Sequence, residues 1–108
     1  MPDYRQLRAW QLGRDLAIQS RPLIKKLPPE ERYALADQWR RAAYSVPLNI
    51  AEGASRRGAP EFRRFLDIAR GSLHELEVIF DLAIGQNYFA NEELAPLQQV
   101  RNECARTV

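Results

Sequence analysis

Three pairs of consecutive arginines form the densest group of chemically active side chains in this sequence. Arg40–Arg41, Arg56–Arg57 and Arg63–Arg64 lie within 25 residues, and Arg70 follows Arg63 by seven positions, on the same side of a helix. The arginine guanidinium is a planar fork of donors that binds phosphates or carboxylates. These seven arginines are therefore candidate ligands for nucleic-acid phosphates, in contacts that weaken as salt is added.

A second interpretation of the same arginines fits the sequence equally well. They can be ordinary surface charges that pair with acidic neighbours, namely Glu52, Glu61 and Asp67. No aromatic residue alternates with the arginine pairs in a stacking arrangement, so binding of unpaired single-strand bases is not indicated. Phosphate binding and surface ion pairing both remain open at this point.

Residues for catalysis or metal binding are scarce in the sequence. His74 is the only histidine, and the residue three positions before it is Gly71, which does not fit a di-iron Glu-x-x-His pair. Cys104 has no candidate base nearby, and the glycines match no phosphate-binding loop. We expect no catalytic residue, no metal and no cofactor, and therefore no enzyme.

Composition predicts one folded domain over residues 1–108, because 45% of the residues are hydrophobic. The single cysteine excludes a disulfide within the chain, no apolar run approaches the roughly 20 residues of a membrane span, and the first residues lack the apolar core of a signal peptide. These features predict a cytoplasmic protein without a membrane anchor. Charge is uneven, at +6 over residues 1–70 and −4 over residues 71–108.

Apolar spacing predicts four amphipathic helices, at about residues 7–27, 29–52, 60–86 and 91–106. Pro22 and Pro47 predict a kink or bend in the first two. In the first helix we expect the buried stripe to comprise Leu7, Trp10, Ala17, Ile24 and Leu27. The third helix carries the clearest pattern, with alternating spacings of four and three: Phe62, Leu66, Ala69, Leu73, Leu76, Phe80 and Ala83. The predicted fold is all-α, an antiparallel up-down-up-down four-helix bundle.

Polar residues within the second helix predict a buried network that fixes the packing. Asn49 lies on the side of Ile50, which should be apolar, and Glu52 lies at a helix C-terminus, where the helix dipole disfavours a negative charge. Together with Gln38, these side chains need partners such as helix ends or an arginine. A structural role is favoured over a ligand site.

The same segment carries a family resemblance. Residues 38–53, QWRRAAYSVPLNIAEG, followed by Arg56–Arg57, resemble the four-helix-bundle proteins encoded in intervening sequences of bacterial 23S ribosomal RNA. The resemblance extends to Tyr4–Leu7 with Trp10, to Pro28 with Glu31 and Tyr33, to Glu61–Phe62 with Phe65–Leu66, and to residues 68–77, so that it covers nearly the whole chain. It implies a left-handed antiparallel bundle that assembles into a ring, usually a homopentamer.

The resemblance also implies candidate partners. Accessory proteins of diversity-generating retroelements look similar, and in those a basic ring surface is thought to engage nucleic acid and a reverse transcriptase. We therefore expect a non-enzymatic oligomer that binds structured RNA around the join of the second and third helices. The alternative is a structural or protein-interaction ring whose arginines pair with acidic residues of neighbouring subunits.

Overall fold

The computed structural model describes residues 3–108, which form four long helices and two short 3₁₀ helices. The long helices are α1 (Arg8–Ile24), α2 (Leu35–Ala54), α3 (Ala59–Gly85) and α4 (Asn91–Thr107), and the short ones are η1 (Tyr4–Gln6) and η2 (Pro29–Glu31). No strand occurs within residues 3–108. Within that range, no helix has both the length and the apolar character needed to cross a membrane.

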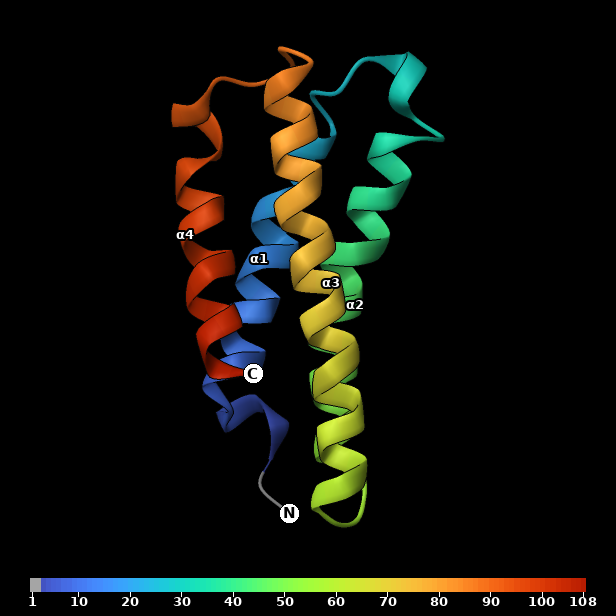
Figure 1. The fold of residues 1–108 in the computed structure, drawn as a ribbon, viewed down its shortest axis with the longest axis vertical. Helices are drawn as coiled ribbons and strands as arrows, with labels where there is room; N and C mark the ends of the chain where they lie inside the picture. Colours follow the sequence, from blue (N-terminus) through green and yellow to red (C-terminus); the bar gives the residue numbers. More distant parts are fainter. Residues whose placement is uncertain (1–2) are drawn as a thin grey trace.

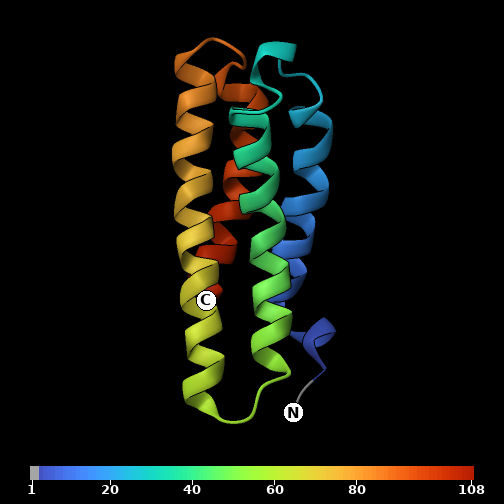
Figure 2. The ribbon, with the colours of Figure 1, turned by 90° about the vertical axis from the view of Figure 1, so that its right-hand side faces the viewer.

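Successive long helices run in opposite directions and pack side by side, as the two ribbon views show (Figures 1 and 2). The first turn of α1 meets the last turns of α4, where an Arg8 guanidinium nitrogen lies 3.6 Å from Glu103 Oε2. Between α1 and α2, Trp39 donates a hydrogen bond to Ser20, and between α2 and α3, Ser72 donates one to Ser45. The predicted all-α four-helix bundle is confirmed.

The core is built around Trp39, which is fully buried. Its ring makes edge contacts with Phe80 at 5.4 Å and with Phe89 at 6.0 Å between centroids. The indole Nε1–H donates to the buried Ser20 hydroxyl at 3.0 Å, so the only polar atom of the side chain is satisfied. On α3 the predicted seam is buried from Ala69 to Ala83, whereas its first two members are only half-buried.

The buried stripe of α1 differs from the predicted one. The structure buries Ala9, Leu12, Leu16 and Ser20, with Ala17 beside them, whereas Trp10 and Ile24 are only half-buried. The observed spacing of three, four and four residues follows one face of a helix. Ser20 belongs to this stripe because it accepts the hydrogen bond from Trp39, a tertiary contact that a hydropathy pattern does not reveal.

The predicted helices at residues 7–27 and 29–52 end and begin at other positions. Helix α1 ends at Ile24, and residues 29–31 form η2, so α2 starts only at Leu35. Glu31 accounts for the later start of α2. One of its carboxylate oxygens accepts from the N–H of Leu35, the first residue of α2, at 3.2 Å, and the other accepts from the Tyr88 hydroxyl at 2.6 Å. Both helices continue through their prolines, Pro22 and Pro47.

Cys104 lies in the core with no exposed surface, and its thiol donates to the Ala9 carbonyl of α1 at 3.5 Å. Burial raises the pKa of Cys104 from 9.0 to about 11. Since the folded-state pKa lies above the unfolded one, the neutral thiol stabilises the fold fully below pH 9.0. That contribution is lost as the pH rises towards about 11.

This environment predicts an unreactive thiol. At about pH 8 we expect Cys104 of the folded protein to react with a disulfide reagent at least about 100-fold more slowly than in urea, because both thiolate formation and access are suppressed. The reaction is followed by absorbance of the released thiolate. Equal rates with and without urea would contradict a buried Cys104.

Candidate nucleic-acid interface

The α2–α3 hairpin projects beyond the first turn of α1 and the last turn of α4 (Figures 1 and 2). We call its end, residues 52–64, the hairpin tip. Gly58 precedes α3 with a φ of 84°, a left-handed conformation that favours glycine. Gly53 brings α2 and α3 together, because a Cβ there would lie 2.9 Å from both Phe62 Cδ1 and Phe65 Cβ.

Four arginines and two glutamates give the hairpin tip a net charge of +2. Arg56 lies 3.7 Å from Glu52, and Arg64 lies 3.7 Å from Glu61, in exposed pairs that contribute little to stability. The same two guanidinium groups lie over the ring of Phe65, at 5.2 and 5.4 Å from its centroid. The ring thus helps to hold two guanidinium groups at the tip.

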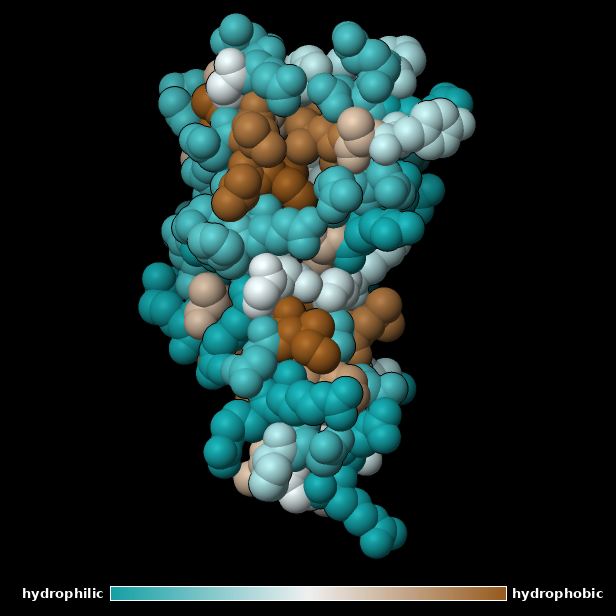
Figure 3. Space-filling view, turned by 45° about the vertical axis from the view of Figure 1, so that its right-hand side comes forward, coloured by the Kyte–Doolittle hydropathy of each residue, from teal (hydrophilic) through white to brown (hydrophobic). Residues whose placement is uncertain are grey.

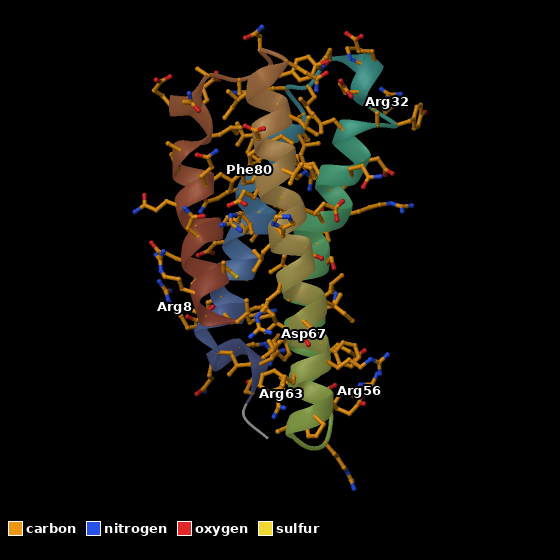
Figure 4. The ribbon with its side chains drawn as sticks, in the orientation of Figure 1. Arg8, Arg32, Arg56, Arg63, Asp67 and Phe80 are labelled. Atoms are coloured by element: carbon orange, nitrogen blue, oxygen red, sulfur yellow. The ribbon has the colours of Figure 1, made fainter. Side chains whose placement is uncertain are left out.

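Arg57 and Arg63 differ from these two arginines. Both are exposed, and neither has a carboxylate oxygen within 4.0 Å in the described part of the chain. Figure 4 shows Arg56 and Arg63 on opposite sides of the first turns of α3. The hairpin tip therefore presents positive charge on more than one side.

The other three candidate arginines lie away from the tip. Arg40 and Arg41 share one carboxylate, that of Asp37, at 3.5 and 3.3 Å. Arg41 precedes Gly53 by twelve residues, a distance of about 18 Å along the axis of α2. Arg70 pairs with Asp67 and also donates to the Val108 carbonyl. The structure thus brings four of the seven arginines together.

The surface ion pairs that the second interpretation requires are all present. Glu52 pairs with Arg56, Glu61 with Arg64, and Asp67 with Arg70. These pairs account for three of the seven candidate arginines, and Asp37 accounts for two more. Within residues 3–108, only Arg57 and Arg63 of the set have no acidic partner.

The structure does not join Gln38, Asn49 and Glu52 into one buried network. Gln38 and Glu52 are exposed, and Glu52 accepts from the Ser55 hydroxyl at 3.0 Å. Asn49 instead donates to the hydroxyl of Ser45 at 2.9 Å, and that hydroxyl also accepts from Ser72 at 2.8 Å. The polar link between α2 and α3 is therefore Asn49–Ser45–Ser72, of which the sequence analysis singled out only Asn49.

Arg101 is a further charged residue that sequence reasoning missed. Its side chain is only 12% exposed, and it donates to the Leu73 carbonyl at 3.2 Å while pairing with Glu77 at 3.2 Å. It ties α4 to α3, which gives it a structural role. His74 is exposed, with Nδ1 3.9 Å from Glu77 Oε1, and no cluster of potential metal ligands occurs in residues 3–108.

Comparison with protein families identifies the chain. The family model of the 23S rRNA-intervening sequence protein matches residues 5–108, nearly the whole length. The chain belongs to this family. A comparison with curated proteins gave no match.

Residues 38–53, the segment that carries the resemblance, form most of α2 and so one arm of the α2–α3 hairpin. Trp39 lies in the core, Ser45 bonds Ser72, and Gly53 permits the close approach of α3. The segment therefore positions the hairpin tip with its four arginines.

Proposed function

We propose that this 23S rRNA-intervening sequence protein is a non-enzymatic, oligomeric helical bundle that binds structured RNA through the hairpin tip. The observation that carries the proposal is the pair Arg57 and Arg63, two exposed guanidinium groups without acidic partners in the described residues, in the hairpin that projects from the bundle. Arg56 and Arg64 lie beside them in weak, exposed pairs that phosphates can replace.

The character of the tip favours RNA whose bases are paired. Its only aromatic residue, Phe62, is half-buried beside Gly53, so the tip lacks an exposed ring on which single-strand bases could stack. Guanidinium groups on more than one side suit the phosphates and 2′-hydroxyls of a folded RNA, which proteins recognise mainly by shape.

The double variant Arg57→Gln/Arg63→Gln tests this proposal. We expect its affinity for an RNA hairpin, measured by fluorescence anisotropy over a series of salt concentrations, to fall about tenfold. The slope of log K against log salt should decrease by about 2, because two phosphate contacts are lost.

Arg14→Gln/Arg106→Gln is the matched control, since it removes two exposed arginines that also have no carboxylate within 4.0 Å in the described chain. This control should retain nearly the affinity of the unchanged protein. Equal losses in both double variants would show that only net charge matters, and an unchanged affinity in Arg57→Gln/Arg63→Gln would refute the proposal.

Self-association is supported by apolar side chains on the surface. On α3, Ile68, Val78 and Leu82 are 43–47% exposed, and on α2 Leu48 is 67% exposed. Figure 3 shows separate hydrophobic patches within a hydrophilic surface on the face where α2 and α3 come forward. Contact between copies would bury such patches.

A ring scaffold, in which the arginines pair with acidic residues of neighbouring subunits, is the alternative function. Light scattering on Arg57→Gln/Arg63→Gln separates the two. An oligomer of unchanged mass with weakened RNA binding supports the RNA proposal, whereas dissociation of the oligomer supports the scaffold.

A further inference from the structure

A second basic surface lies between α1 and α2, toward the η2 end of the bundle. It consists of two adjoining pockets of about 290 and 360 Å³ that share Ile24, Lys25 and Arg40. We call it the α1–α2 groove. Arg32, which lines its outer part, lies at the opposite end of the molecule from Arg56 and Arg63 of the hairpin tip (Figure 4).

Cations line this groove, and none of the residues that line either pocket is acidic. Arg21 and Lys25 are one turn apart at the C-terminal end of α1, Arg40 faces them from α2, and Arg32 follows η2. Within residues 3–108, Arg21, Lys25 and Arg32 have no carboxylate oxygen within 4.0 Å, and Arg40 shares Asp37 with Arg41. The groove therefore holds positive charge that the protein itself leaves largely uncompensated.

The floor of the inner pocket of the groove, next to Tyr44, is apolar. Ala17 and Ala43, both buried, form this floor, and their small side chains leave the space between the two helices open. Tyr44 follows Arg40 by one helical turn and is 47% exposed, so its ring flanks the cations. An apolar floor with one aromatic wall accepts a flat ring, while the cations accept a phosphate.

We propose that the α1–α2 groove binds an aromatic organic phosphate of mononucleotide size. The phosphate lies against Arg21, Lys25 and Arg40, and the ring lies against Tyr44 and the alanine floor. The volumes of the two pockets suit a small ligand. Such a ligand is either a free nucleotide or one nucleotide of an RNA strand, and the proposal does not depend on the hairpin tip.

Calorimetric titrations at low salt test this site with three probes: ADP, inorganic phosphate and a short 5′-phosphorylated single-stranded RNA. Arg21→Gln/Lys25→Gln changes two exposed side chains to a residue of similar helix propensity, so the fold is retained. We expect it to weaken ADP binding about tenfold or more. Tyr44→Leu should weaken binding of ADP but not of phosphate, since only ADP carries a ring.

The hairpin-tip variant Arg57→Gln/Arg63→Gln is the control and should bind ADP as the unchanged protein does. If the single-stranded RNA but not ADP responds to Arg21→Gln/Lys25→Gln, the ligand is a nucleotide within a strand. If the unchanged protein binds neither ADP nor the single-stranded RNA, or if Arg21→Gln/Lys25→Gln binds both of these probes normally, the groove proposal is overturned. RNA-hairpin binding by the tip would be unaffected by that result, so the two proposals fail independently.

Discussion

Replacing Trp39 with alanine is expected to lower the free energy of unfolding by about 3–5 kcal/mol, a large part of the stability of a domain of this size. The indole is fully buried, packs against Phe80 and Phe89, and donates to Ser20 of α1. Its removal leaves a cavity that the surrounding helices can fill only in part. Urea unfolding followed by circular dichroism measures the loss.

Trp39→Phe separates the hydrogen bond from the packing. This variant keeps an aromatic ring but leaves the buried Ser20 hydroxyl without its donor, at a cost of about 1–3 kcal/mol. Trp10→Ala is the control, because Trp10 is only half-buried and should cost much less. Equal losses for Trp10→Ala and Trp39→Ala would contradict the central place of Trp39.

Gly53→Ala is expected to destabilise the protein by about 1–2 kcal/mol, although alanine favours a helix by about 1 kcal/mol over glycine. The added Cβ would lie 2.9 Å from Phe65 Cβ, an atom fixed by the backbone of α3, so the helices must separate. The clash therefore outweighs the gain in helix propensity. Thermal and urea unfolding give the sign of the effect.

Gly71→Ala is the matched control for this prediction. Gly71 also lies within a helix, but nothing lies within 4 Å of a Cβ placed there. Only the higher helix propensity of alanine remains, so Gly71→Ala should stabilise the protein by up to about 1 kcal/mol. If both alanine variants stabilise the protein, the close approach of α2 and α3 at Gly53 is refuted.

The buried seam of α3 was predictable because its seven apolar residues recur at alternating spacings of four and three. The structure buries five of these seven residues. The stripe of α1 was not predictable in the same way, because the buried Ser20 belongs to it through Trp39. Likewise the start of α2 depends on Glu31, whose second partner, Tyr88, lies 57 residues away. Boundaries and polar core positions depend on such distant contacts, which spacing alone does not contain.

The candidate site was predicted in part for a similar reason. Arginine pairs that are close in the sequence are separated by the length of α2, so Arg40 does not join Arg57 at the hairpin tip. Arg40 instead lies with Arg21 and Lys25 of α1, a grouping that exists only once α1 and α2 are packed. Which acidic residues compensate which arginines also depends on side-chain geometry, as Asp37 shows by serving two of them.

The projecting hairpin tip has a consequence for how this protein loses structure. Midway along the bundle each long helix packs against its neighbours, whereas the end of the hairpin projects beyond α1 and α4 and is held mainly by the contact between α2 and α3 (Figures 1 and 2). Fraying of this end exposes little apolar surface, so it costs less free energy than global unfolding. The arginines thus lie on a segment whose local opening leaves the Trp39 core closed, and a bound polyanion would suppress that opening without altering the rest of the fold.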